Sequence, residues 1–266
     1  TRLQLGQFDD QWEIVPEQHW DFEDVNQALK KSPHFVLIPH DRNWDIQTME
    51  DFSLQIENNY RSIVEFLGYD PQITPQKFHI YANAESIGLR TRNMKQGFVK
   101  GNAILQILHP VYRGIESEAA QLKVLEEILG APKQDILLEG LAIYLTPRWQ
   151  GRGYRHWAER LYLADCHMSI AQLLDGDFQQ NASYIGKGIW SATLVAYLLE
   201  SWGKEVFLEK YPSWDPTKSE IEALNQSWQS WLAGSLSPTP SNKHVLPSLI
   251  FLKCMTLAQE GYIIVE

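Results

Sequence analysis

The stretch ILLEGLAIYLT, residues 136–146, places a single carboxylate, Glu139, in an otherwise apolar run. An ionised carboxylate in a low-dielectric interior costs several kcal/mol unless another group pairs with it. We therefore expect a partner for Glu139, and the arginines nearest in sequence are Arg148, Arg152 and Arg155. In that interpretation Glu139 is a buried structural carboxylate that is salt-bridged to an arginine.

The residues before this stretch predict a second helix beside it. The segment 115–129 has a helical pattern, Gly130, Pro132 and Asp135 interrupt it, and a further helix is expected at 136–146. A helix rises about 1.5 Å per residue and an extended chain about 3.3 Å per residue, so the short loop lets the second helix return beside the first. Carboxylates on the facing helices, Glu118 and Glu139, then converge.

The rest of the chain predicts an α+β fold. Apolar residues at spacings of three and four predict a long amphipathic helix over 45–68 that ends at Gly68. The segments HFVLIP, KFHIYAN and NAILQILHP predict buried strands at 34–39, 77–83 and 102–110, and Asp21 is a candidate cap of a short N-terminal helix. Further helices are expected at 151–165, 169–174, 188–202, 204–210 and 217–233. A small mixed sheet with a long helix is thus followed by a mainly helical half.

This order, together with the Glu-Gly helix, resembles the gluzincin-like (zincin-fold) metallopeptidase domains. The sequence LLEGLAIYL is similar to the family's second zinc motif, and SYIGKGIWSATLVAYLLESWGKEVFLEKY (183–211) is similar to a later helix and turn. The resemblance covers 34–233. It implies that Glu139 stands at the position of the third zinc ligand.

The first zinc motif of that family, His-Glu-x-x-His, is degenerate here. The best register places SEAAQ, residues 117–121, where this motif is expected. Glu118 then stands at the general-base position, which we interpret as vestigial, and Ser117 and Gln121 stand at the positions of the two histidines. Hydroxyl and amide oxygens bind Zn²⁺ poorly beside imidazole, so we expect no cofactor. Zinc is expected only if Glu139 recruits histidines from elsewhere in the chain.

Two further groups of residues are candidates for a site. The loop TPRWQGRGYRHW, residues 146–157, predicts a ligand cleft in which Trp149, His156 and Trp157 face a peptide or glycan, and the alternative is ordinary packing. Tyr184 matches a tyrosine that stabilises an oxyanion in some gluzincins, a role with little meaning without zinc. His34, His79 and His109 lie beside the predicted strands and are expected to be structural.

Composition excludes several classes of protein. The net charge is −10 and no long basic run occurs, so nucleic-acid binding is not expected. No apolar run reaches the roughly 18 residues of a transmembrane helix. The two cysteines, Cys166 and Cys254, exclude a disulfide framework but leave a single bridge open.

The ends of the chain predict additional segments around the gluzincin-like domain. Residues 1–33 form an N-terminal extension, and residues 234–248 are rich in Pro and Ser and are expected to be a linker. The tail, 249–266, is similar to the opening strand of some sugar-processing TIM-barrel domains. That resemblance implies the N-terminal part of a larger bacterial protein that is secreted, periplasmic or surface-anchored.

Three hypotheses about function follow. The first is a catalytically degenerate peptidase-like domain, a pseudoenzyme that acts as a binding or scaffolding module beside a carbohydrate-active domain. The second is an active zinc metallopeptidase with nonstandard ligands, in which Glu118 is the base. The third is a metal-free glycoside hydrolase that uses Glu118 and Glu139 as paired carboxylates.

Overall fold

The computed structural model describes residues 5–8, 11–14, 30–40, 46–83, 86–88, 97–108, 118–147, 152–163, 165–175 and 184–236. The strands are β1 Leu5–Phe8, β2 Gln11–Ile14, β3 Lys30–Lys31, β4 Phe35–Pro39, β5 Gln76–Tyr81, β6 Gly97–Lys100 and β7 Ala103–Ile107. The helices are α1 Ile46–Leu67, α3 Ala119–Leu129, α4 Asp135–Tyr144, α5 Tyr154–Leu163, α6 Ile170–Leu174, α8 Tyr184–Trp202, α9 Lys204–Lys210 and α10 Lys218–Ser235. The helix predicted after Asp21, most of the predicted linker and the whole predicted tail lie outside the described residues.

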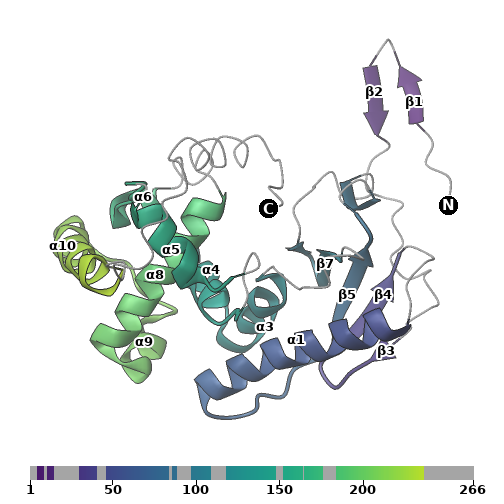
Figure 1. Ribbon diagram of the computed structural model, residues 1–266, viewed down its shortest axis with the longest axis horizontal. Coiled ribbons are helices and arrows are strands. Elements are labelled where there is room, and N and C mark those ends of the chain that lie inside the picture. Colours follow the sequence, from purple (N-terminus) through teal and green to yellow (C-terminus); the bar gives the residue numbers. More distant parts are fainter. Residues whose placement is uncertain are drawn as a thin grey trace.

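The central sheet is small and mixed. Its five strands lie in the order β3-β4-β5-β7-β6, and β4, β5 and β7 run parallel to one another. The short edge strands β3 and β6 are antiparallel to their neighbours. Helix α1 connects β4 to β5 and lies along the sheet (Figure 1). The strands β1 and β2 form a separate antiparallel hairpin.

The edge strand β6 was not predicted, although the sequence carries a signal for it. Gly101 and Asn102 connect β6 to β7, and Gly101 adopts a φ of 57°. A Gly-Asn pair between two strand-like segments is typical of a tight hairpin, because such a turn needs positive φ values.

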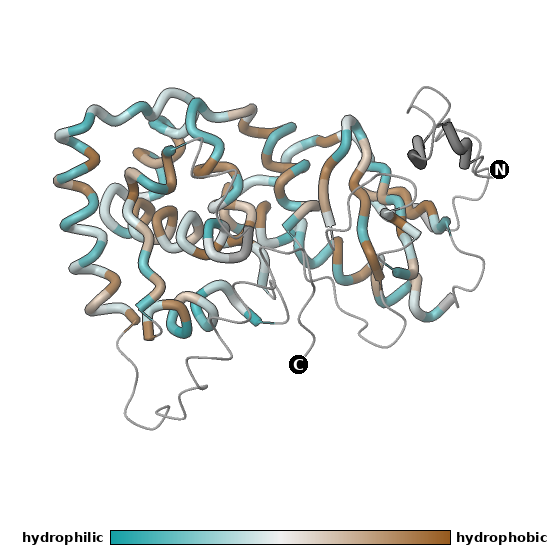
Figure 2. Tube along the Cα trace, turned by 90° about the horizontal axis from the view of Figure 1, so that it is seen from above, coloured by the Kyte–Doolittle hydropathy of each residue, from teal (hydrophilic) through white to brown (hydrophobic). Residues whose placement is uncertain are grey.

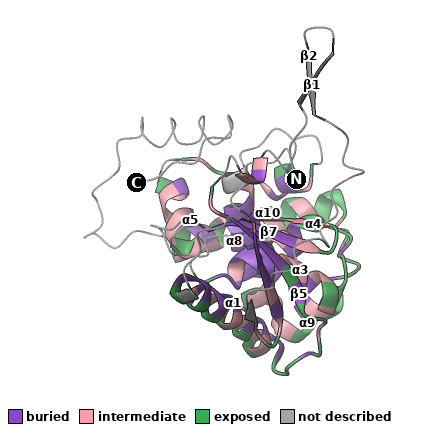
Figure 3. Ribbon diagram, turned by 90° about the vertical axis from the view of Figure 1, so that its right-hand side faces the viewer, coloured by how far each residue is buried: buried purple, intermediate pink, exposed green. Residues whose placement is uncertain are grey.

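The sheet buries both of its faces. One face, with Phe35, Phe78 and Ile104, packs into the main core, which continues into the helices. The other face forms a smaller cluster around Tyr81 and Leu105. This division follows from the alternation of side chains along each strand. Figure 3 shows the buried residues gathered between the sheet and the helices.

Helices α4 and α8 form the centre of the helical half. They pack against each other over most of their lengths, and α3, α5, α6 and α9 surround them. Most apolar residues of α4 and α8 are buried, whereas much of α10 is hydrophilic (Figure 2). Helix α8 ends at Gly203, which has a φ of 80°, as its sequence predicts. Helix α10 starts with a capping box formed by Thr217 and Glu220.

The predicted α+β class and the order of the main elements are confirmed. Helix α8 begins four residues before the predicted start at 188, because glycines 186 and 188 weaken the helical pattern without interrupting the helix. Helix α10 continues to Ser235, beyond the predicted boundary at 233. Among the described helices, none combines the length and apolar character required to cross a membrane.

Candidate functional site

Glu139 lies on α4 and forms an ion pair with a lysine of α8. The Lys187 Nζ is 2.8 Å from the Glu139 Oε2, and the two side chains are only 16% and 12% exposed, respectively. The prediction that Glu139 has a basic partner is confirmed, but the prediction that this partner is an arginine is wrong. Arg155 instead lies 3.8 Å from Glu159 on its own helix. The partner comes from a distant segment because α8 packs directly on α4.

Gly140 explains how the two helices come close enough for this pair. A Cβ added to Gly140 would lie 2.4 Å from the backbone oxygen of Ser191 and 2.9 Å from the Val195 Cγ2. Only glycine is therefore compatible with this approach of α4 to α8. Ser191 is one helical turn after Lys187, so the same approach holds Lys187 against Glu139.

The ion pair is a structural element of the helical core. Two charges that are mostly removed from water gain little net stability as a pair, because each has lost hydration. Removal of one partner leaves the other charge uncompensated, which costs about 3–5 kcal/mol in buried sites. The pair is therefore more important for keeping the helices in this arrangement than for total stability.

Helix α3 contributes two buried polar side chains. Glu118 directly precedes the helix and is 2% exposed, so it is not a solvated surface carboxylate. Gln121 is 1% exposed, and neither its Nε2 nor its Oε1 makes a hydrogen bond with the residues that the structure describes. An unpaired buried amide costs about 1–3 kcal/mol. Helix α3 packs on α4, which carries Glu139.

The described residues do not fit a zinc site. Zinc requires several imidazole, thiolate or carboxylate ligands, but the Glu139 carboxylate is bound to an ammonium group and Gln121 offers a neutral amide. In the part of the chain that the structure describes, no cluster of three or more His, Cys, Asp or Glu side chains is present. Ser117, at the other predicted histidine position, lies outside the described residues.

The remaining predicted site residues are only partly described. His156 and Trp157 lie on α5 with their rings edge to face at 5.3 Å, whereas Trp149 lies outside the described residues. The ligand cleft predicted from these three residues stays a prediction. Tyr184 is the first residue of α8, and its side chain is not among the described ones.

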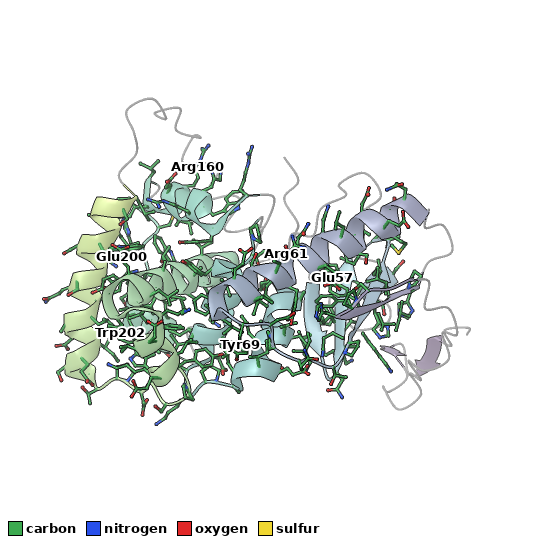
Figure 4. The ribbon with its side chains drawn as sticks, turned by 90° about the horizontal axis from the view of Figure 1, so that it is seen from below. Glu57, Arg61, Tyr69, Arg160, Glu200 and Trp202 are labelled. Atoms are coloured by element: carbon green, nitrogen blue, oxygen red, sulfur yellow. The ribbon has the colours of Figure 1, made fainter. Side chains whose placement is uncertain are left out.

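The histidines beside the strands have structural partners, as predicted. The His34 Nδ1 lies 2.7 Å from the Oε2 of Glu57, which is labelled on α1 in Figure 4, and its ring stacks on Tyr60. The His79 Nδ1 lies 2.8 Å from the His40 Nε2. His109 lies outside the described residues.

Sequence reasoning missed one cavity in the helical half. It has a volume of about 350 Å³, and its lining includes Tyr144, Tyr154, Glu200 and Trp231. Tyr154 belongs to the segment 146–157 from which a ligand cleft was predicted, but Trp149, His156 and Trp157 are not among the residues that line this cavity. The sequence pattern that indicated this cavity is the aromatic Tyr154 and the charged Arg155 directly after Gly153.

Comparisons of the chain with protein-family models, with curated proteins and with solved structures gave no match in any of the three.

Proposed function

We propose that this chain is a zincin-like domain that has exchanged its metal for an internal cation and acts as a binding or scaffolding module. The order of β4, α1, β5, β7, α3 and α4 agrees with the order on which the resemblance to gluzincin-like domains rests. The parallel pairing of β4, β5 and β7, with α1 as the crossover, is also compatible with it.

The ion pair between Lys187 and Glu139 is the observation that carries this proposal. In the proposed ancestry, Glu139 would have donated its carboxylate to a divalent cation. The Lys187 Nζ lies 2.8 Å from that carboxylate. A positive charge at this distance supplies the electrostatic compensation that the metal would have supplied. The helix pair is then stable without any ligand at this point.

Gln121 supports the same interpretation from the neighbouring helix. It stands at a position where the family has a zinc-binding histidine, and its amide is buried without a hydrogen bond to any described residue. Such an amide has the size and polarity of an imidazole but binds Zn²⁺ poorly. A site that has lost its metal by substitution is expected to keep a polar side chain of this kind.

Measurement of zinc in the purified chain tests the proposal. The 266-residue protein is incubated with equimolar Zn²⁺ and desalted, and its metal content is determined by mass spectrometry. We expect far less than one zinc per chain and no peptidase activity that is sensitive to a chelator. Stoichiometric zinc that disappears in the Glu139→Gln variant would overturn the proposal in favour of a metallopeptidase with nonstandard ligands.

A restored site provides the matched positive control. The triple variant Ser117→His, Gln121→His, Lys187→Ala returns both histidines and removes the competing ammonium. It is expected to bind one zinc, and this binding is expected to require Glu139. If the triple variant folds and binds no zinc, the three positions do not form a former metal site and the zincin ancestry is wrong.

A further inference from the structure

A cavity of about 350 Å³ lies among α4, α5, α8 and α10. Its walls are formed mainly by Tyr144, Tyr154, Arg155, Leu199, Glu200 and Trp231. Glu200 is labelled in Figure 4 beside α10. The volume is at the lower end of the range of about 300–1,000 Å³ that small-molecule sites occupy, and the mixture of aromatic rings with a few polar groups is typical of them.

This cavity is distinct from the Glu139–Lys187 pair. Side chains on an α-helix repeat every 3.6 residues, so Ser191, four residues after Lys187, shares its face of α8. Ala196, which lines the cavity, comes nine residues after Lys187 and therefore lies on roughly the opposite face. The two sites are thus on different sides of the same helix.

Tyr144 and Tyr154 contribute two hydroxyl groups to the lining of the cavity. The rings of Tyr144 and Tyr154 lie 5.6 Å apart at an angle of 44°. Within the part of the chain that the structure describes, neither hydroxyl makes a hydrogen bond. Burial raises the pKa of Tyr154 to about 12, with Tyr144 adding to the shift, so its hydroxyl is a neutral donor at ordinary pH.

Hydrogen bonds within the protein hold Trp231, Glu200 and Arg155 in place at the cavity. The Trp231 Nε1 donates to the Glu200 Oε2 at 2.9 Å, which holds the indole at the cavity. The Arg155 Nη2 donates to the Ser235 backbone oxygen at 2.8 Å. Among the described residues, the Arg155 guanidinium and the Glu200 carboxylate at the cavity have opposite charges, and Glu159 lies 3.8 Å from Arg155, so the site offers no excess positive charge to an anion. A neutral ligand with many hydroxyl groups is the best match.

We propose that this cavity binds a neutral saccharide of one or two rings. The apolar face of a pyranose packs on aromatic rings such as Trp231 and Tyr154, while its hydroxyl groups meet the tyrosine hydroxyls, Glu200 and Arg155. Anionic ligands are disfavoured because Glu200 and Glu159 offset Arg155 among the described residues at this site. This inference goes beyond the proposed loss of zinc, and it stands or falls independently of it.

Saturation-transfer difference NMR on the full 266-residue chain tests this inference. The probes are glucose, N-acetylglucosamine, maltose and cellobiose at millimolar concentration, and glucose 6-phosphate represents an anionic sugar. We expect transfer to the ring protons of at least one neutral sugar, with a dissociation constant of about 1 mM or tighter, and weaker transfer to the phosphate. Absence of transfer to all four neutral sugars would overturn the proposal.

Tyrosine-to-phenylalanine variants test whether the sugar binds in this cavity. The double variant Tyr144→Phe, Tyr154→Phe removes both hydroxyls but keeps the ring volumes, and it is expected to weaken binding about tenfold. The control is Tyr162→Phe on α5, since Tyr162 packs on His167 at 4.8 Å and does not line the cavity. Equal binding by the double variant and the wild type, with unchanged circular dichroism, would place the sugar elsewhere and refute the assignment.

Discussion

Replacement of Lys187 by methionine is expected to destabilise the protein strongly, because it leaves Glu139 charged and without its partner. Methionine keeps most of the volume of lysine, so the change removes mainly the charge. Loss of one partner from a buried ion pair costs about 3–5 kcal/mol, and the residual exposure of 12% for Glu139 and 16% for Lys187 places the expected loss near the lower value. At about 2–4 °C per kcal/mol for a domain of this size, the melting temperature falls by about 6–12 °C.

The double variant Lys187→Met, Glu139→Gln tests whether the two residues act as a pair. It removes both charges, so the free energy of unfolding is expected to return to within about 1 kcal/mol of the wild type. Urea unfolding followed by tryptophan fluorescence measures all of these free energies, since the chain contains ten tryptophans. If the two single losses simply add in the double variant, the two residues do not act as a pair and the reasoning is wrong.

Three more changes test other parts of the structure. Gly140→Ala is expected to lower the free energy of unfolding by about 3 kcal/mol or more, because the new Cβ would lie 2.4 Å from the Ser191 backbone oxygen. In Gly234→Ala the new Cβ in α10 meets nothing within 4 Å, so this variant should raise the free energy of unfolding by about 0.5–1 kcal/mol. Thermal melts of the two alanine variants therefore shift in opposite directions, and a loss at both sites would argue against the close helix approach. Gln121→Leu removes an unpaired buried amide and is expected to stabilise by about 1–3 kcal/mol in urea titrations; a loss of stability would mean that the amide has a partner. The folded-state pKa of Tyr154 is raised to about 12, so the unfolded chain loses this proton first and stability falls as the pH rises from about 10 to 12. Tyr154→Phe should flatten that decline in unfolding free energy, and an unchanged slope would contradict the burial of this hydroxyl.

The order of elements was predictable because the patterns that carry it are local. The spacing of apolar residues over 45–68 predicted α1 within one residue at each end. The strand β6 was missed because only its hairpin turn, and not its own short sequence, distinguishes it. Tertiary packing decides such edge strands more than propensity does.

The partner of Glu139 was not predictable from proximity in sequence. Three arginines lie close to Glu139 in sequence, but its actual partner is on a helix that reaches α4 only through tertiary packing. The sequence nevertheless contains a hint, because Lys187 is a lone cation in the apolar start of α8, between Gly186 and Gly188. Two isolated charges of opposite sign on two apolar helices are a better guide to a buried pair than sequence distance.

The charge that compensates Glu139 is part of the polypeptide itself. A bound ion equilibrates with its surroundings, so its occupancy changes with supply, competing chelators and pH. An ammonium group on a side chain of α8 cannot leave, and its local concentration is set by the fold alone. The compensation of the Glu139 charge is therefore established by folding itself and does not vary with the supply of any ion.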